Sequence, residues 1–227
     1  MDGPHDLGGR PGYGPVPVDA DRPWTAWWEP YSYALASVAA RLAGVDGDTV
    51  RYLMEQMPPA EYARIASPGR WLWVAEQCAS QGGLASREEL IDRALRRALG
   101  RQPHEQPALA YPEPVRTLPD RQPGLSHNRA DPQGAQPPRF AVGDVVVTSD
   151  RASEGHTRLP AYLRGRRGIV ALLNGFWVFP DSHIGGGPEA PTWVYAVRFN
   201  AADLWPDALT HDVCADLFEP YLEVASG

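Results

Sequence analysis

The sequence contains no lysine, so every one of its basic side chains is an arginine. Acidic residues outnumber the arginines, and the formal net charge is −7. A phosphate-binding face is normally basic overall, so this balance argues against a nucleic-acid partner. Each basic contact that the chain makes is a planar, permanently charged guanidinium, which suits paired hydrogen bonds to an oxyanion.

The chain also lacks the usual sets of metal-ligating and catalytic residues. Its two cysteines, Cys78 and Cys214, are far apart in the sequence and predict neither a disulfide framework nor a thiolate metal site. The six histidines show no metal-ligand spacing. No Gly-rich phosphate loop and no Gly-x-Ser-x-Gly turn is present. We therefore expect no metal site and no self-contained catalytic centre in this chain.

Long apolar runs are missing as well. No stretch approaches the roughly 18 apolar residues of a membrane span, and the N-terminus lacks the pattern of a signal peptide. The expectation is a cytoplasmic protein with no membrane partner.

Composition divides the chain into four segments. Residues 1–23 are rich in Gly and Pro and predict an extended arm or a disordered tail. Residues 24–100 carry apolar side chains at helical spacing, and they predict a domain of four or five short helices. Residues 101–138 form a Pro-rich linker. Residues 139–227 form a β domain.

Helix ends are marked by residues that favour caps. Asp48 is a candidate N-cap of the second helix. Ser67 is a candidate N-cap of the fourth, followed by Pro68 at the first helical position. Ser86 to Glu89 form a capping box for the last helix. The broad apolar face of the first helix holds residues at intervals of three and four: Trp24, Trp27, Trp28, Tyr31, Leu35, Val38, Ala39 and Leu42.

The β domain reads as about five short antiparallel strands. Val145 to Val147 form the first, and two apolar runs around Asn174-Gly175 predict a hairpin with a type I′ turn. Alternating apolar residues from Trp193 to Phe199 predict another strand, followed by one helical turn. Residues 213–224 predict one or two final strands. Strands of this number and length suggest a small barrel or roll.

Between the first two predicted strands lies a polar stretch, residues 155–168. It carries four arginines, a histidine and a tyrosine among turn residues. A loop of this kind on a rigid sheet is a common position for functional groups, although it is also typical of a solvated basic connection. Arg51 lies at the edge of the apolar stripe of the second helix. It points either along the surface to solvent or into an interface or cleft.

Several segments of the sequence resemble the β subunits of nitrile hydratases. The resemblance spans both ends and both predicted domains, and only the 101–138 linker lacks it. The segments are Met1-Asp2-Gly3-x-His5-Asp6-x-Gly8-Gly9, Gly12-Tyr13-Gly14-Pro15-Val16, Glu55-Gln56-Met57-x-Pro59-Ala60-x-Tyr62, Phe140-x-x-Gly143-Asp144-x-Val146, Gly155-His156-Thr157-Arg158-x-Pro160-x-Tyr162-x-Arg164-Gly165, Pro180-Asp181, Tyr195-x-Val197-x-Phe199, Leu204-Trp205 and Glu219-Pro220-Tyr221-Leu222-Glu223.

The resemblance implies an α+β fold with an extended N-terminal arm, a small all-α domain and a Src-homology-3-like β-barrel or roll. It implies a subunit of a hydro-lyase that adds water to a nitrile to give an amide. In this family an α subunit carries non-corrin cobalt(III) or iron(III) in a Cys-rich loop with two oxidised cysteines, and the β subunit donates no metal ligand. The arm is then expected to wrap the α subunit in an αβ or α2β2 assembly.

The resemblance also implies roles for individual residues. Arg51 and Arg158 correspond to arginines that hydrogen-bond the oxidised cysteines of the α subunit. Trp71, Val50 and Ala36 fall at substrate-pocket positions. His156, Tyr162 and Arg164 are expected to form loop structure and interface contacts, as are Arg166 and Arg167.

The sequence departs from the family pattern just before Trp71. The family usually has two aromatic residues and a His there, where this chain has Ser67-Pro68-Gly69-Arg70, and Ala36 replaces a common aromatic. The departure suggests either a roomier pocket for a bulky or heterocyclic nitrile, or a weaker activity. The alternatives to a nitrile hydratase subunit are a thiocyanate hydrolase-like subunit, a non-catalytic activator of the same family, and a scaffold protein.

Overall fold

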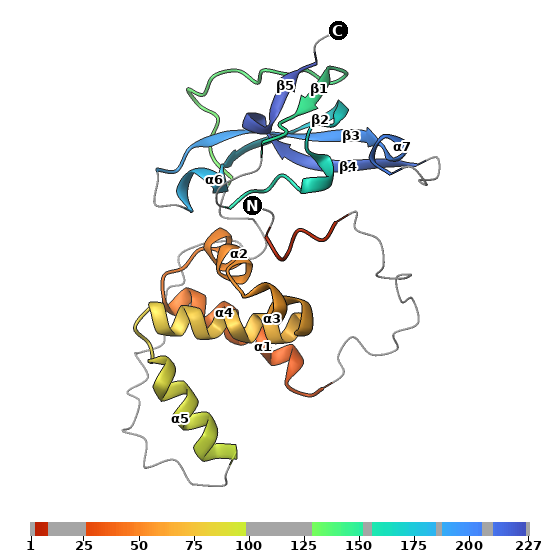
Figure 1. Cartoon of the computed structure of the whole chain (residues 1–227). Helices are drawn as coiled ribbons and strands as arrows, with labels where there is room; N and C mark the ends of the chain where they lie inside the picture. The colour runs from red at the N-terminus through yellow and green to blue at the C-terminus, as the bar shows by residue number, and fades with distance from the viewer. Residues whose placement is uncertain are drawn as a thin grey trace. The chain divides into compact units, whose positions relative to one another are not determined.

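A computed structural model describes residues 3–8, 26–98, 129–151, 156–184, 188–205 and 211–225. The chain divides into two compact units, one of residues 19–125 and one of residues 1–18 together with 126–227. Within the described residues the first unit is helical and the second contains a sheet (Figure 1), which confirms the α+β class. Most of the predicted arm and linker lies outside the described residues, which include only 3–8 of the arm and 129–138 of the linker.

The helical unit is built around the packing of α1 against α4. Small side chains such as Ala36 and Ala39 form the inner face of α1, and Val74 and Cys78 form that of α4. Cys78 is fully buried and is therefore a core residue, as its apolar surroundings in the sequence predict, and this burial raises the pKa of its thiol. The helices are α1 (Glu29–Leu42), α2 (Gly47–Glu55), α3 (Pro59–Arg64), α4 (Ser67–Gln81) and α5 (Arg87–Ala98).

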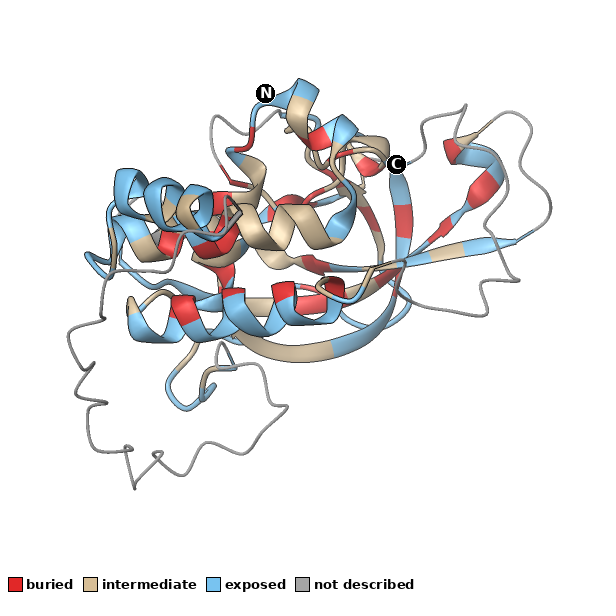
Figure 2. Ribbon diagram, turned by 90° about the horizontal axis from the view of Figure 1, so that it is seen from below, coloured by how far each residue is buried: buried red, intermediate tan, exposed pale blue. Residues whose placement is uncertain are grey.

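The large apolar side chains predicted for the first helix are mostly exposed. Trp27 is 82% exposed, and Figure 2 shows buried and exposed positions along the helices of this unit. Alanine and serine, having short side chains, let α1 approach α4 closely, so the bulky residues are left on the opposite side. These exposed residues are Trp27, Tyr31, Leu35, Val38 and Leu42.

Two predicted helix caps are wrong by one or two positions. Asp46, rather than Asp48, caps α2, because its Oδ1 accepts the backbone N–H groups of Asp48 and Thr49, each at 2.9 Å. Ala66 precedes α4 in an extended conformation, so Ser67 is already its first helical residue. The Ser86 cap is confirmed by its Oγ, which accepts the N–H of Glu89 at 3.1 Å.

The second unit contains a five-stranded antiparallel sheet in the order β4-β3-β2-β1-β5. Among the described residues β4 pairs only with β3, and β5 only with β1, so the sheet is not closed, and the barrel form of the expected barrel or roll is not confirmed. The strands are β1 (Val145–Thr148), β2 (Arg167–Val178), β3 (Pro191–Asn200), β4 (Asp212–Phe218) and β5 (Leu222–Val224). Short helical segments connect them: η1 (Ala161–Leu163), α6 (Pro180–His183), α7 (Ala201–Leu204) and η2 (Glu219–Tyr221).

The predicted hairpin at Asn174-Gly175 is wrong. This dipeptide lies inside β2, which continues to Val178 and pairs with β3 on both sides of it. Gly175 has φ +108° and occupies an irregularity in the pairing, where a glycine relieves the backbone strain. The indole N–H of Trp177 donates to the carbonyl of Asn174 at 3.1 Å. The Asn-Gly signal therefore marks a bulge in a long strand.

Alternation along β3 is confirmed and supplies the core of the sheet. Tyr195, Val197 and Phe199 are fully or almost fully buried. Gly168 of β2 lies directly against this layer, because a Cβ at this position would be 2.6 Å from a methyl carbon of Val197 and 2.8 Å from the ring of Phe199. Among the described residues, no helix has the length and apolar character required to cross a membrane.

Candidate functional site

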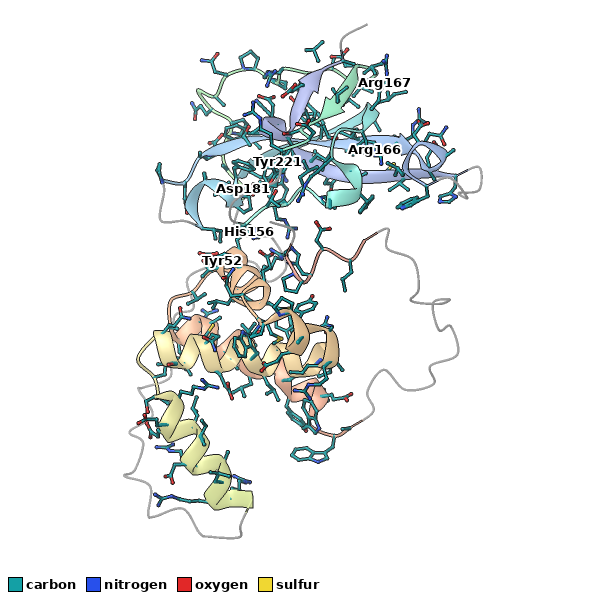
Figure 3. The ribbon with its side chains drawn as sticks, in the orientation of Figure 1. Tyr52, His156, Arg166, Arg167, Asp181 and Tyr221 are labelled. Atoms are coloured by element: carbon teal, nitrogen blue, oxygen red, sulfur yellow. The ribbon has the colours of Figure 1, made fainter. Side chains whose placement is uncertain are left out.

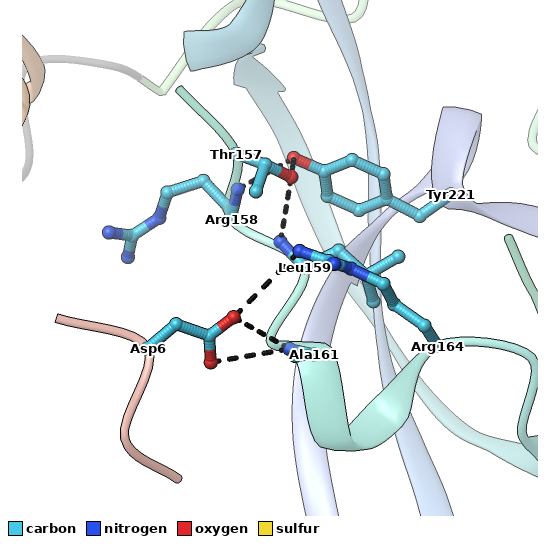
Figure 4. A network of polar contacts seen from close by, with 7 residues as sticks. All are labelled: Asp6, Thr157, Arg158, Leu159, Ala161, Arg164 and Tyr221. Atoms are coloured by element: carbon cyan, nitrogen blue, oxygen red, sulfur yellow. Dashed lines mark hydrogen bonds and ion pairs between the residues drawn. The ribbon is translucent and has the colours of Figure 1, made fainter. Parts of the chain in front are cut away.

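Arg158 lies in a segment that is held to the sheet unit by its backbone. Its N–H donates to the hydroxyl oxygen of Tyr221 at 2.8 Å, while its side chain is exposed and extends away from the network (Figure 4). The hydroxyl of Thr157 donates to the same oxygen at 3.3 Å and accepts the N–H of Leu159 at 3.2 Å. The backbone is thus fixed at two adjacent residues, and the guanidinium is left available to a partner.

Tyr221 is itself oriented by Asp181 on α6. The tyrosine hydroxyl donates to Oδ2 of Asp181 at 2.7 Å, and Figure 3 shows both side chains in the sheet unit, with His156 also labelled. Burial raises the pKa of Asp181, and the bond from Tyr221 and the charge of the buried His156 oppose that rise. Burial first, and the Asp181 carboxylate next, raise the pKa of Tyr221. Tyr221 therefore stays protonated and acts as a fixed hydrogen-bond donor.

Tyr162 and Arg164 follow Arg158 in the same segment. The ring of Tyr162 stacks on that of Trp205, with a centroid distance of 5.4 Å. Burial and the Asp6 carboxylate raise the pKa of Tyr162. Arg164 is mostly buried and lies 3.8 Å from Asp6. Both residues therefore make contacts within this chain, which is consistent with a role in the structure of the loop.

Arg51 lies on α2 of the helical unit. Its guanidinium donates to Oδ1 of Asp48 at 3.0 Å. The two side chains differ in exposure, at 54% for Arg51 and 3% for Asp48. A buried carboxylate therefore holds one side of an otherwise accessible guanidinium, and this side chain can meet an anion outside the chain.

The predicted pocket residues lie on three helices of the same unit. Trp71 of α4 is half-buried, and Tyr33 of α1 meets it edge to face at a centroid distance of 4.9 Å. Val50 is half-buried beside the helical core. Ala36 is 1% exposed and belongs to that core, so it can influence a ligand only through the side chains that pack around it.

Arg70, which replaces the histidine expected before Trp71, has a structural role here. Its guanidinium lies 3.8 Å from the centroid of the Tyr62 ring. It also donates to the carbonyl of Tyr62 through Nε at 3.2 Å and through Nη2 at 2.8 Å. These bonds join the end of α3 to the start of α4, next to Trp71 in the sequence.

Sequence reasoning did not assign the residues that position the Arg158 segment. Asp6, Asp181 and Tyr221 were noted only as parts of matching segments. No local pattern could identify them, because Tyr221 is 63 residues from Arg158 and 40 from Asp181, and Asp6 is 155 from Ala161. Among the described residues there is no group of three or more His, Cys, Asp or Glu side chains that could bind a metal ion.

Two family models match the sequence. "Nitrile hydratase beta subunit, N-terminal" matches residues 1–116, and "Nitrile hydratase beta subunit, C-terminal" matches residues 129–224. Together they cover both predicted domains.

Curated relatives match over their whole length. The low-molecular weight cobalt-containing nitrile hydratase subunit beta of Rhodococcus rhodochrous is 35% identical over 231 residues, covering 98% of this chain and 99% of the relative. The cobalt-containing nitrile hydratase subunit beta of Pseudonocardia thermophila is 32% identical, covering 99% and 97%. A solved chain of thiocyanate hydrolase from Thiobacillus thioparus is 29% identical with a TM-score of 0.37, covering 39% of this chain and 78% of that one, a likeness too limited to bear on function.

Proposed function

The chain belongs to the nitrile hydratase β-subunit family, and from this premise we propose that it forms an active nitrile hydratase with a metal-carrying α subunit. The observation that carries the proposal is the family match over both halves of the chain, together with an Arg158 whose backbone is fixed and whose guanidinium is exposed. The reaction is the addition of water to a nitrile, which gives an amide.

In the proposed complex, Arg51 and Arg158 bind the oxidised cysteines of the α subunit. A sulfinate or sulfenate is an anion, and a guanidinium can satisfy it with paired charge-assisted hydrogen bonds. The α subunit holds the metal, cobalt(III) or iron(III), which supplies Lewis-acid chemistry when bound. The part of this chain is to orient anionic ligands and to line the substrate pocket.

An exposed apolar surface supports a partner for the helical unit. Large exposed side chains from Tyr31 to Leu42 lie on the outer side of α1, and Trp27 just before this helix is exposed as well; contiguous exposed apolar residues typically mark interaction sites. We propose that the α subunit covers this surface in an αβ or α2β2 assembly.

For the substrate, we propose a pocket that accepts bulky or heterocyclic nitriles. Arg70 is held by Tyr62, and Ala36 is small and buried, so neither places an aromatic ring beside Trp71. Competition between aliphatic and aromatic nitriles in the assembled enzyme tests this proposal. A clear preference for small aliphatic nitriles would refute it.

Co-expression with the α subunit tests the function itself. We expect a stable complex that converts a nitrile to its amide. Release of a hydrolysis product from thiocyanate would favour a thiocyanate hydrolase-like enzyme. Metal delivery to the α subunit without turnover would favour an activator, and the absence of both would leave a scaffold.

A further inference from the structure

The N-terminal residues 3–8 lie against the same segment that carries Arg158. The carboxylate of Asp6 accepts the backbone N–H of Ala161 through Oδ2 at 2.9 Å and through Oδ1 at 3.3 Å (Figure 4). Its Oδ2 is also 3.8 Å from a guanidinium nitrogen of Arg164. Asp6 is buried, so these contacts form inside the sheet unit of this chain.

A second contact places the same residues against the segment. A Cβ added to Gly8 would be 2.8 Å from Cε1 and 2.9 Å from Cδ1 of Tyr162, closer than carbon atoms normally approach. The backbone at Gly8 therefore lies directly on the tyrosine ring. Tyr162 is in turn stacked on Trp205, which fixes its position from the other side.

The two ends of the chain thus hold the Arg158 segment between them. Tyr221, near the C-terminus, binds its backbone at Arg158, and Asp6, near the N-terminus, binds it at Ala161. Only two residues separate these anchor points. A carboxylate bond to a backbone N–H is charge-assisted and stronger than a neutral one, so the Asp6 contact restricts the segment substantially.

We infer that Asp6 is a positioning residue, which fixes the backbone of the Arg158 segment so that the guanidinium is presented in one place. The inference rests on the proposed role of Arg158. It also gives residues 3–8 a function within their own chain, where the family resemblance suggested an arm that wraps the partner. Because Asp6 acts through Arg158, its loss should lower turnover more than substrate binding.

The test uses the complex with the α subunit and the variants Asp6→Ala, Asp6→Asn and Gly8→Ala. We expect Asp6→Ala to lower kcat about tenfold with little change in KM, the effect of losing one charge-assisted hydrogen bond. Asp6→Asn keeps an acceptor for Ala161 and should recover part of the loss. Gly8→Ala should reproduce the defect sterically, because its Cβ would push residues 3–8 away from Tyr162.

A double variant separates positioning from general stability. In an Arg158→Lys background the further change Asp6→Ala should have little additional effect on kcat, since the two residues act as a unit. The matched control is Asp144→Ala, because Asp144 accepts the N–H of Ala141 at 2.8 Å in a turn before β1. This control should leave kcat unchanged.

Hydrogen exchange provides a readout that does not depend on activity. The amides of Arg158, Leu159 and Ala161 should exchange faster in Asp6→Ala than in the parent complex, while Asp144→Ala leaves them unchanged. Unchanged exchange and unchanged kcat in Asp6→Ala would overturn the inference. Failure of both Asp6 variants to assemble would also overturn it, because residues 3–8 would then form a contact between subunits. If the parent complex hydrates no nitrile, the proposed function fails, and the exchange measurement alone decides the role of Asp6.

Discussion

Replacing Tyr221 with phenylalanine tests how the Arg158 segment is held. The change removes one oxygen atom and leaves the ring in place. That oxygen donates to Asp181 at 2.7 Å, accepts the N–H of Arg158 at 2.8 Å, and accepts the hydroxyl of Thr157 at 3.3 Å. Tyr221 is buried, so water cannot freely replace these bonds.

The expected cost follows from the partners that lose the bond. The hydrogen bond to Asp181 involves an ionisable group and contributes about 1.5–3 kcal/mol, and the bond from the Arg158 N–H about 0.5–1.5 kcal/mol. The Thr157 bond is long, and we add little for it. The sum is about 3 kcal/mol, which for a chain of this size lowers the Tm by about 6–12 °C.

Thermal unfolding of the assembled complex measures this loss, and hydrogen exchange at the amides of Thr157, Arg158 and Leu159 locates it. Tyr195→Phe is the matched control, because the Tyr195 hydroxyl donates to Glu219 at 2.5 Å and accepts the N–H of Phe140 in the same unit, and neither bond involves the Arg158 segment. Both variants should be destabilised, but only Tyr221→Phe should loosen the segment and lower kcat. If Tyr221→Phe melts within a few degrees of the parent and keeps its kcat, Tyr221 does not hold the segment. If Tyr195→Phe lowers kcat equally, the effect is one of general stability.

Four further predictions concern single contacts. Burial raises the folded-state pKa of Asp181, so its contribution to stability is present at low pH and is lost as the pH rises through that pKa. Urea unfolding from about pH 4 to about pH 8 should therefore show the parent losing stability relative to Asp181→Asn. Stability curves that stay parallel over this range would contradict the assignment. Arg158→Lys should assemble normally but lose about 30- to 100-fold in kcat/KM, because an ammonium cannot make the paired contact of a guanidinium. Steady-state kinetics together with a titration of α-subunit binding would distinguish a loss of kcat/KM from a loss of assembly. Gly168→Ala should lower the free energy of unfolding by about 1–3 kcal/mol in denaturant titrations, since its Cβ would be 2.6 Å from Val197, and a neutral result would show that the sheet yields there. Asp46→Ala should lower the free energy of unfolding by about 1 kcal/mol, because α2 loses its N-cap. If Asp46→Ala has no effect and Asp48→Asn lowers the free energy of unfolding by that amount, Asp48 is the cap instead.

The sequence predicted a helix or strand correctly where neighbouring residues by themselves favour that structure. Alternation from Trp193 to Phe199 predicted β3, and the Ser86 capping box predicted the start of α5. The Asn174-Gly175 hairpin failed because a tight turn and a bulge require the same backbone freedom from glycine. Only the pairing of β2 with β3 on both sides of Gly175 distinguishes the two.

In the first helix, the sequence pattern predicted the helix but not which of its sides is buried. Its spacing identified a helix, but the side that packs on α4 carries alanine and serine, and the larger apolar side chains are exposed. Hydrophobicity alone ranks the large residues first for the core. Close approach of two helices instead favours small residues at the contact, and only the packed structure shows which side of α1 is used.

By itself the sequence determined the α+β class, the family and the arginines that are candidates for function, since composition, periodicity and matching segments are local properties of the chain. The tertiary structure alone decided how the Arg158 segment is supported. Asp6, Asp181 and Tyr221 are each separated by 40 residues or more from the groups they bind. Folding brings such residues together through the whole sheet, and no periodicity in the sequence records a contact of that range.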